Sequence, residues 1–300
     1  MRTQHDPTTN TIAIEGLAQP LSILHVTDSH MALADERDPE ALPHADHYGA
    51  LFRERTPDGV EPEALFSQAL AHGEAHGVAA TVLTGDIIHF PARAGLERIA
   101  EEVGALSAPY LYTLGNHDWH FPHLDWNDAT RQAHYARFAS LTGGTPAAQA
   151  LDVGDVRLIA LDNSTYQITD AQLDFLRQQL DAPGPCLLFV HIPIALPTLI
   201  PDVVEVWREP IVMGADGWSE EGRAKWKVEQ NEASTRACLD LVGRAENLVG
   251  IFCGHVHFDH VDRVHDGCYQ YVTQPCFEGA HRTIRLDRKS TRLNSSHQII

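Results

Sequence analysis

Positive charge is scarce in this chain, which has 22 Lys and Arg residues against 41 Asp and Glu and a formal net charge of −19. Nucleic-acid backbones and anionic membrane surfaces attract Lys and Arg rather than carboxylates. We therefore expect neither a nucleic-acid polymer nor a membrane surface among the partners of this protein.

Closely spaced cysteine pairs are also absent. The five cysteines are scattered, their number is odd, and no C-x-x-C pair occurs. This pattern favours neither a disulfide framework nor a thiolate zinc site. We expect reduced thiols that are buried or partly buried. The positions are Cys186, Cys238, Cys253, Cys268 and Cys276.

Long apolar runs are missing as well. No stretch approaches the roughly 18 apolar residues that a membrane-spanning helix requires. The first ten residues are polar and lack the apolar segment of a signal peptide. We find no internal repeat, and no feature points to a particular oligomeric state. The expected location is the cytoplasm.

Against these absences stand five short apolar runs, each followed by side chains that bind metals. Short runs of this kind predict buried strands, and polar residues directly after them lie at strand ends, where a rigid sheet can hold them in place. Carboxylates, an amide and imidazoles at one rim predict a site for divalent metal. The five polar blocks are Asp28-Ser29-His30, Gly85-Asp86, Gly115-Asn116-His117-Asp118, His191 and Gly254-His255-Val256-His257.

This ordered set of blocks, from about Ile23 to His257, resembles the calcineurin-like metallophosphoesterase superfamily. Within it, the pattern is closest to the bacterial branch of cyclic-nucleotide and glycerophosphodiester phosphodiesterases. The resemblance implies an α/β fold, a four-layer α/β/β/α sandwich of two mixed sheets. We expect residues 1–286 to form one domain of this kind.

The resemblance also implies a ligand set for two divalent metal ions, with Mn, Fe or Zn as candidates. Any one of these residues alone would more often be a turn, cap or strand-end residue, but all seven occur together. A bridging carboxylate lets two cations lie roughly 3.5–4 Å apart. One metal is expected at Asp28, His30 and His257, the other at Asn116, His191 and His255, with Asp86 between them.

Two further residues are implied in catalysis. In the family pattern a metal-bridging hydroxide attacks phosphorus in line, His117 protonates the leaving oxygen as general acid, and Asp118 orients the imidazole. Histidine suits this role because its pKa is close to neutral. A purely supporting role for His117 stays open. For five other histidines we favour a surface or supporting position over metal binding: His44, His47, His89, His120 and His260.

Two long segments interrupt the alternation of strands and helices. We call residues 35–62 the first insertion and residues 193–231 the second insertion, and we expect both to wall the pocket and set specificity. The second insertion contains Trp207, Trp218 and Trp226. We favour core packing for these tryptophans, and a base-stacking platform is the alternative.

The last residues, 287–300, lose the pattern of the preceding chain and change from acidic to basic composition. They resemble translated sequencing-adapter read-through, so we expect a non-native tail. A genuine disordered tail is the alternative.

The expected function is therefore hydrolysis of a small phosphoester, with a phosphodiesterase favoured and a nucleotide as one candidate substrate. A phosphomonoesterase or nucleotide pyrophosphatase with the same site is the first alternative. A non-catalytic protein-binding scaffold is a remote alternative, because such a scaffold would have lost metal ligands and none of the seven is missing here. No paired arginines follow the Asn116 block, which argues against a protein phosphatase.

Overall fold

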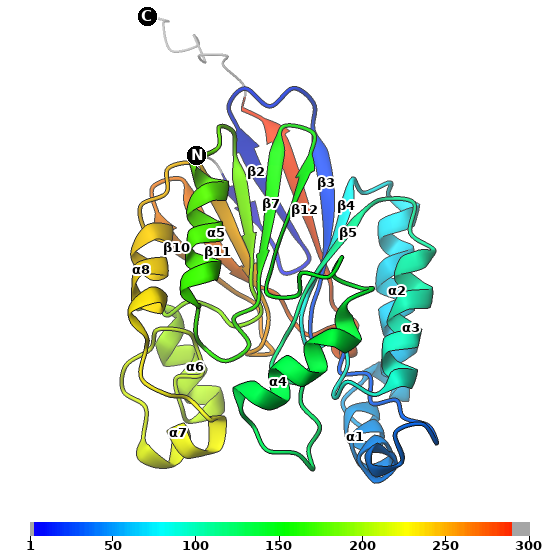
Figure 1. The fold of residues 1–300 in the computed structure, drawn as a ribbon. Helices are drawn as coiled ribbons and strands as arrows, with labels where there is room; N and C mark the ends of the chain where they lie inside the picture. The colour runs from blue at the N-terminus through cyan, green and yellow to red at the C-terminus, as the bar shows by residue number, and fades with distance from the viewer. Residues whose placement is uncertain (1–2, 290–300) are drawn as a thin grey trace, which may run out of the picture.

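The computed structural model describes residues 3–289 and forms two six-stranded sheets that face each other between outer helices (Figure 1). This is the four-layer arrangement with two mixed sheets that the sequence predicts, and that prediction is confirmed.

The first sheet has the strand order β1-β2-β12-β3-β4-β5. Strands β3, β4 and β5 pair in parallel, whereas β12 runs antiparallel to β3. The carboxyl ends of β3, β4 and β5 therefore meet at one edge. The bounds are β1 Thr3–His5, β2 Thr9–Ile14, β3 Leu21–Val26, β4 Ala80–Thr84, β5 Tyr110–Thr113 and β12 Arg282–Arg288.

The second sheet has the order β10-β11-β9-β8-β7-β6. Here β7, β8 and β9 are parallel, so their carboxyl ends also share an edge. A hairpin with its turn at Gly154 and Asp155 joins β6 to β7. The bounds are β6 Ala148–Val153, β7 Val156–Leu161, β8 Cys186–Phe189, β9 Leu248–Cys253, β10 His260–His265 and β11 Cys268–Val272.

The helices fall into two groups. Helices α2 and α3 pack on the outer face of the first sheet, and α5 and α8 pack on that of the second (Figure 1). Helices α1, α4, α6 and α7 lie beneath the lower ends of the sheets in that view. The bounds are α1 Leu42–Arg53, α2 Pro62–Ala75, α3 Arg93–Gly104, α4 Asp128–Tyr135, α5 Asp170–Asp181, α6 Leu199–Trp207, α7 Glu220–Trp226 and α8 Ala233–Val242.

Helix α5 illustrates how local sequence sets a helix start. The Thr169 hydroxyl accepts a hydrogen bond from the Gln172 backbone N–H, and the Gln172 side chain accepts one from the Thr169 N–H. This reciprocal cap satisfies backbone donors that the first helical turn leaves free.

The apolar core is divided by the sheets into three layers. One layer lies between the two sheets and includes Val82, Leu158 and Phe252. His25 of β3 also lies there, fully buried against aromatic rings of the second sheet, and its ring nitrogens lie 3.0 and 2.7 Å from the hydroxyls of Thr273 and Thr84. A buried imidazole in this layer is therefore paired at both nitrogens.

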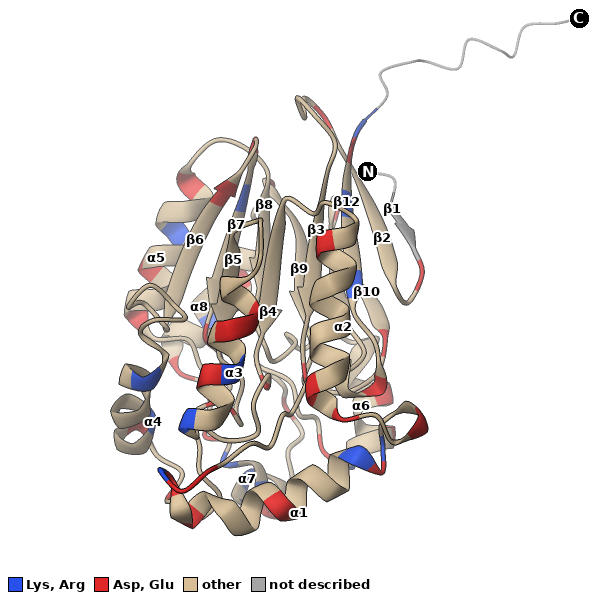
Figure 2. Ribbon diagram, turned by 90° about the vertical axis from the view of Figure 1, so that its right-hand side faces the viewer, with Lys and Arg blue, Asp and Glu red and all other residues tan. Residues whose placement is uncertain are grey.

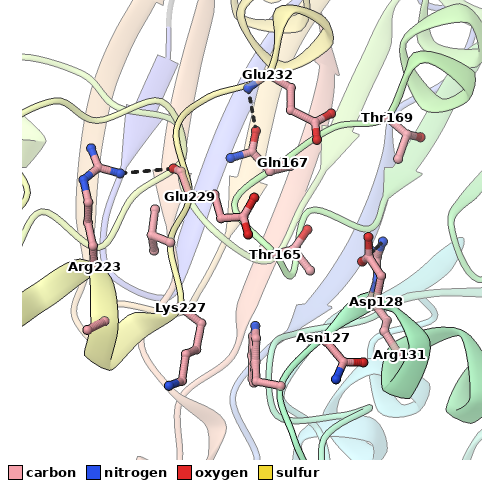
Figure 3. Close-up of a pocket in the computed structure, with 13 residues that line it drawn as sticks. Asn127, Asp128, Arg131, Thr165, Gln167, Thr169, Arg223, Lys227, Glu229 and Glu232 are labelled. Atoms are coloured by element: carbon pink, nitrogen blue, oxygen red, sulfur yellow. Dashed lines mark hydrogen bonds and ion pairs between the residues drawn. The ribbon is translucent and has the colours of Figure 1, made fainter.

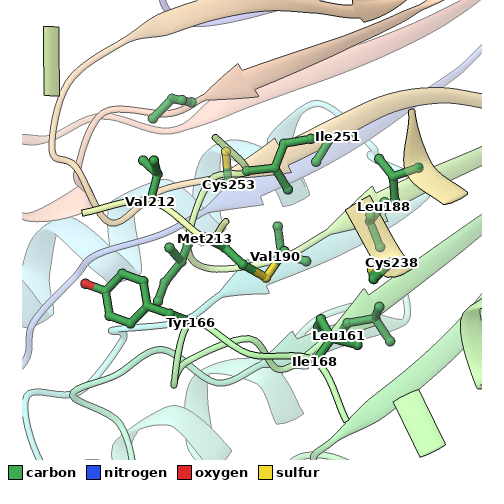
Figure 4. Close-up of a cluster of buried hydrophobic side chains, with 14 of the residues drawn as sticks. Leu161, Tyr166, Ile168, Leu188, Val190, Val212, Met213, Cys238, Ile251 and Cys253 are labelled. Carbon is green, nitrogen blue, oxygen red and sulfur yellow. The ribbon is translucent and has the colours of Figure 1, made fainter. Parts of the chain in front are cut away.

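A second layer, under α5 and α8, is shown in Figure 4. Its aliphatic side chains come from β7, β8 and β9, and Cys238 of α8 packs against them. The second insertion adds Val212 and Met213 to the same cluster. This insertion is thus part of the folded core and not only a surface flap. All five cysteines are buried as free thiols, as predicted.

Some elements differ from the sequence prediction. The first insertion holds helix α1 and the second holds α6 and α7, none of which the sequence predicted, and β10 was also missed. Helix α4 ends at Tyr135, and the chain continues as a short 3₁₀ turn. Strand β12 runs to Arg288, past the proposed boundary at Leu286. Residues 290–300 of the predicted tail lie outside the described residues.

Acidic side chains are spread over several surface helices, as Figure 2 shows for α1, α2 and α3. Of the helices within residues 3–289, none combines the length and the apolar character that a membrane span needs.

Candidate metal centre

Three of the predicted ligands meet at the carboxyl end of β3. The Nε2 atoms of His30 and His257 lie 3.2 Å apart, and Asp28 Oδ1 lies 3.3 Å from His257 Nε2 and 3.8 Å from His30 Nε2. Asp28 is fully buried and His30 nearly so. We call these three residues the first cluster.

A second cluster lies beside the first and contains Asp86, Asn116, His191 and His255. His191 Nε2 is its centre, because it lies 3.2 Å from each of Asp86 Oδ2, Asn116 Oδ1 and His255 Nδ1. The sequence predicted these four residues together, with Asp86 shared between two metals.

The Asp86 carboxylate reaches both clusters with one oxygen. Its Oδ2 lies 3.2 Å from His191 Nε2 and 3.8 Å from His30 Nε2, whereas its Oδ1 accepts a hydrogen bond from the His117 backbone N–H. Burial opposes ionisation, yet the nearby imidazoles of His191 and His117 hold the pKa of Asp86 well below its usual range. The group is therefore an anion that faces two sets of nitrogen atoms.

Neighbouring groups select which ring nitrogen faces the clusters. His191 Nδ1 donates to the Thr84 carbonyl oxygen at 2.8 Å, so Nε2 carries the free lone pair. The remaining nitrogen of His255, Nε2, lies 3.0 Å from the Tyr166 hydroxyl. Burial opposes protonation of His191, but Asp86 raises its pKa to about 9. The Asp86 charge thus favours the imidazolium form of His191 where no cation is bound, and the free lone pair at Nε2 belongs to the neutral ring.

His30 has an unusual supporting group. Its Nδ1 lies 3.1 Å from Nδ1 of His89, so one of these nitrogens donates and the other accepts. When His30 Nδ1 donates, its Nε2 lone pair points toward Asp28 and His257. His89 is buried and packs against the Tyr48 ring of α1, with 4.0 Å between ring centroids.

The backbone is strained at the ligands. Five of the seven predicted ligands have positive φ angles in the left-handed region, which non-glycine residues rarely adopt. Such strain persists only where the surrounding structure imposes it, and it concentrates at functional sites. The five are Asp28 (53°), His30 (48°), Asp86 (51°), His255 (70°) and His257 (60°).

Close approach of the loops explains two of the motif glycines. A Cβ on Gly115 would overlap Asp86 Oδ1, and a Cβ on Gly254 would overlap Asp28 Oδ2. The glycines thus let neighbouring strand ends bring their ligands into contact distance.

The donor set fits divalent metal ions. Metal–ligand bonds of about 2.0–2.2 Å place adjacent ligand atoms roughly 3.0–3.6 Å apart in tetrahedral or octahedral geometry. The closest atom pairs in both clusters, at 3.2–3.3 Å, fall in this range. Asp28 Oδ1 is buried and has no hydrogen-bond partner among the described residues. An unpaired buried carboxylate oxygen of this kind is costly unless a cation compensates it.

His117 lies where the clusters meet a cavity. Its ring stacks on His89 with 4.2 Å between centroids, and it lines a cavity of about 510 Å³ together with Asn116. Burial lowers the pKa of His117, and the Asp86 carboxylate partly opposes this shift. The imidazole is therefore placed to face a ligand in that cavity.

Asp118 was predicted to orient the His117 imidazole, and its carboxylate is hydrogen-bonded to other groups. It accepts four hydrogen bonds, from the Tyr112 hydroxyl and from the backbone N–H groups of Asp86, Ile88 and Gly115, at 2.7–3.1 Å. Among the described residues, no hydrogen bond joins this carboxylate to the His117 ring. Burial and then the Asp86 charge raise the pKa of Asp118 to about 7, and these hydrogen bonds oppose the shift. The four bonds hold Asp118 against the loops that carry the predicted ligands.

The other histidines are divided. His89 contacts both His30 and His117, whereas the His120 ring bonds the Leu124 carbonyl oxygen and His260 pairs with Asp202 and Asp262. His44 and His47 lie on α1. Sequence reasoning missed Tyr166 altogether, because no motif marks it. For His89, three residues after Asp86, sequence reasoning favoured a surface or supporting position over metal binding.

Known proteins share sequence with this chain. The family model described as calcineurin-like phosphoesterase matches residues 21–259. A cAMP/cGMP dual specificity phosphodiesterase of Mycobacterium tuberculosis is 23% identical over 247 residues, which cover 79% of this chain and 61% of that protein. A Rhodococcus erythropolis protein named "Probable cyclic nucleotide phosphodiesterase" is 26% identical over 187 residues, covering 57% of this chain and 52% of that protein. The chain thus spans only about half to three-fifths of these relatives.

Solved structures resemble the fold. A dimetal phosphatase from Danio rerio superposes with a TM-score of 0.54 at 12% identity, covering 88% of this chain and 91% of that chain. A purple acid phosphatase from yellow lupin (Lupinus luteus) seeds gives a TM-score of 0.51 at 10% identity, covering 96% of this chain and 59% of that chain. At these identities the likeness concerns the fold alone.

Proposed function

Because the chain belongs to the calcineurin-like phosphoesterase family, we propose that it is a two-metal phosphodiesterase that acts on a small, nucleotide-like ester. The observation that carries this proposal is the Asp86 oxygen that faces His30 in one cluster and His191 in the other. A shared carboxylate between two nitrogen-rich clusters is the arrangement that a pair of adjacent divalent ions requires.

The two clusters would hold one ion each. Asp28, His30 and His257 would bind the first, Asn116, His191 and His255 would bind the second, and Asp86 would bind both. When bound, divalent ions neutralise phosphate oxygens and lower the pKa of a coordinated water. Oxygen and imidazole donors without thiolates favour Mn, Fe or Zn.

His117 would act on the leaving group. It lines the cavity beside the clusters, and burial lowers its pKa, so the free enzyme holds it largely neutral near pH 7. The negative charge of a bound phosphoester favours the protonated form, which can then donate a proton to the departing oxygen. The stack on His89 fixes the direction of the ring.

A diester is favoured over a monoester on the names of two relatives, which are a cAMP/cGMP phosphodiesterase and a cyclic nucleotide phosphodiesterase. A phosphomonoesterase or nucleotide pyrophosphatase with the same clusters is the second candidate, because the clusters themselves bind a phosphate group and not the rest of the ester.

A hydrolysis panel with Mn-loaded protein tests the proposal. The substrates are bis-p-nitrophenyl phosphate, p-nitrophenyl phosphate, 3′,5′-cyclic AMP and a glycerophosphodiester. We expect kcat/KM to be highest for diesters, and we expect Asp86→Asn to abolish turnover. Monoester turnover far above diester turnover would overturn the substrate class, and no metal-dependent turnover of any ester would overturn the activity.

A further inference from the structure

The cavity beside the metal centre has a distinctive lining. It has a volume of about 510 Å³, within the range of small-molecule sites. Its lining includes Asn116 and His117 and also Lys225, Trp226 and Lys227 of the second insertion. We call these last three residues the Lys-Trp-Lys segment. It begins near the end of α7 and lines the same cavity as His117.

Lysine is almost absent elsewhere in the chain. The full sequence contains three lysines, Lys225, Lys227 and Lys289, so two of the three line this one cavity. Both are exposed, and neither forms an ion pair with any residue that the structure describes. Lys225 also lies near the Glu209 carboxylate. Hydrogen bonds from Ser219 lower the pKa of Glu209, and the charge of Lys225 adds to this shift. The ammonium groups are therefore available to a ligand.

The Lys-Trp-Lys segment is anchored against the ligand histidines. The Trp226 ring lies edge-on to Trp207 at 5.6 Å and 6.2 Å from the ring of His255. Trp207 in turn donates its indole N–H to the Val256 carbonyl oxygen and contacts the His257 ring at 5.5 Å. Contact with the metal site thus fixes where the two lysines stand.

The backbone at Lys227 is strained, as it is at five of the predicted ligands. Its φ of 56° lies in the left-handed region, where glycine is the usual residue at a helix end. Tyr166, which lines the same cavity, also has positive φ, 64°. Both residues accept an unfavourable backbone conformation beside the centre.

An adjoining cavity of about 460 Å³ shares Lys227 and Trp126 with the first. Figure 3 shows Arg223 and Lys227 of the second insertion opposite Asn127 and Arg131. Three acidic side chains offset the cations there, and Arg131 is paired with Asp128. In the first cavity, by contrast, two lysines face a single carboxylate, that of Asp125. The excess positive charge belongs to the cavity at the metal centre.

We propose that the Lys-Trp-Lys segment binds a second phosphate group of the substrate, on an arm that also carries an aromatic base. This inference rests on the proposed function, because it assigns the scissile phosphate to the metal clusters. The scissile group would have its charge met by the metals, so two further cations some way along the cavity match a second anion. A molecule with a net charge of −19 otherwise repels such a ligand. Trp226 and Trp126 supply faces for the base.

The test compares substrates that differ only in a terminal phosphate. Thymidylyl-(3′→5′)-thymidine is assayed without it, with a 5′-phosphate and with a 3′-phosphate. For wild-type protein we expect kcat/KM for one of the two phosphorylated substrates to be at least tenfold higher than for the unphosphorylated substrate, mainly through a lower KM. In K225A/K227A that preference should fall to within about twofold of unity. The double substitution should lower kcat/KM for the preferred substrate at least tenfold more than it lowers kcat/KM for bis-p-nitrophenyl phosphate.

Two matched variants sharpen the result. K289A removes the third lysine, which pairs with Glu15, and should keep the wild-type preference. K225R/K227R keeps the charge and should retain most of the preference. An equal loss by K225A/K227A on all substrates would overturn the inference, because it would indicate a structural role. A preference unchanged by the double substitution would overturn it as well.

Binding provides a readout that is independent of turnover. Calorimetry should give at least tenfold tighter binding of thymidine 3′,5′-bisphosphate than of thymidine 5′-monophosphate to metal-loaded wild type, and the difference should vanish in K225A/K227A. If no diester is hydrolysed but this lysine-dependent difference is found, the proposed function fails and the phosphate site stands. If diesters are hydrolysed without the difference, the reverse holds.

Discussion

At the scale of single residues, groups behind the ligands determine how the imidazoles are used. Thr84 fixes the tautomer of His191 through its carbonyl oxygen, Tyr166 contacts His255, and His89 contacts His30. Partners of this kind commonly change metal affinity by 10–100-fold when removed. The pocket residues around the ligands are therefore expected to affect metal binding as well as turnover.

The first prediction concerns His89. His89→Ala removes the partner of His30 Nδ1, so we expect the affinity for metal to fall roughly 10–100-fold. Metal titration followed by calorimetry measures this change. His265→Ala is a matched control, because the His265 ring bonds only a neighbouring backbone carbonyl oxygen. Equal affinity in wild type and His89→Ala would show that His30 needs no such partner.

The second prediction concerns His117. If it protonates the leaving oxygen, His117→Ala should slow esters with poor leaving groups by about 10²–10⁴-fold, and activated nitrophenyl esters much less. Rates of a series of alkyl and aryl diesters measure the dependence on leaving-group pKa. The same loss for every ester would assign His117 to binding alone.

Residue roles were predictable from sequence only where the chemistry of the side chain decides them. All seven predicted ligands lie in the two clusters. The role of Asp118 was inferred from the family pattern, in which it is adjacent to His117 in sequence, whereas its carboxylate is hydrogen-bonded to the backbone of Asp86 and Gly115. Tyr166 comes from a loop with no motif, so only the fold brings it to His255.

At the scale of elements, the two sheets bring their carboxyl-terminal edges together, and the loops there pack at the limit of close contact. Gly115 touches Asp86, and Gly254 touches both Thr27 and Asp28. Any side chain at these glycines must push a ligand aside. The geometry of the centre thus depends on residues that bind nothing.

The third prediction follows from this contact. Gly115→Ala should displace Asp86 and reduce bound metal from two ions to one or none, at a stability cost of about 1–3 kcal/mol for overpacking. Elemental analysis and thermal unfolding measure both effects. Gly104→Ala, at the end of α3 with open space around it, is the control and should leave the metal content unchanged. Full metal content in Gly115→Ala would contradict the prediction.

The fourth prediction concerns pH and the contact between α2 and the segment before β12. Burial, with neighbouring His72 and His76, lowers the pKa of His281 to about 4. The folded state then prefers neutral His281, so this contribution to stability is complete above about pH 6.5 and is lost as pH falls toward 4. In metal-free protein, lowering the pH from about 6.5 toward 4 should reduce the free energy of unfolding of His281→Gln less than that of wild type. Equal reductions in the two proteins, measured by denaturant titration at each pH, would contradict this.

Elements with clear periodicity were predictable, whereas α1, β10 and the two helices of the second insertion, α6 and α7, were not. The sequence of α1 alternates histidine with small and apolar residues and leaves only Phe52 buried, so no apolar face announces a helix. Strand β10 is polar and lies at the sheet edge, where only its pairing with β11 defines it. Helix α4 ends at Tyr135, where the chain tightens into a 3₁₀ turn that starts at Ala136.

At the scale of the whole molecule, seven ligands from two sheets link the sheets at one edge. Asp28 and Asp86 follow strands of the first sheet, whereas His191 and His255 follow strands of the second. Bound ions would therefore join the two halves of the sandwich. Without them, Asp28 Oδ1 stays buried with no hydrogen-bond partner among the described residues.

The fifth prediction is that metal removal destabilises the fold. Free metal at about 1,000 times its Kd adds about 4 kcal/mol per site, since the unfolded chain lacks the assembled clusters. Calorimetric unfolding before and after chelation should show a clear fall in Tm that Mn, Fe or Zn restores, and elemental analysis should find two ions per chain. A single ion, or an unchanged Tm, would contradict the two-metal proposal.

The architecture of the whole molecule was predictable because five motif blocks carry it, but the roles of the individual tryptophans in the second insertion were not. Trp207 and Trp226 were expected mainly to pack a core, and they do pack on each other, yet Trp226 also lines the cavity. Packing and ligand contact use the same aromatic side chain, so composition alone cannot separate them.

The scarcity of lysine has a practical consequence. An amine-selective reagent meets only the chain's α-amino group and three side chains, two of which line the cavity beside the candidate metal centre. A fluorophore attached by acylation would thus report directly on events in that cavity. A lysine-specific protease, for the same reason, would cleave the described chain chiefly within the second insertion.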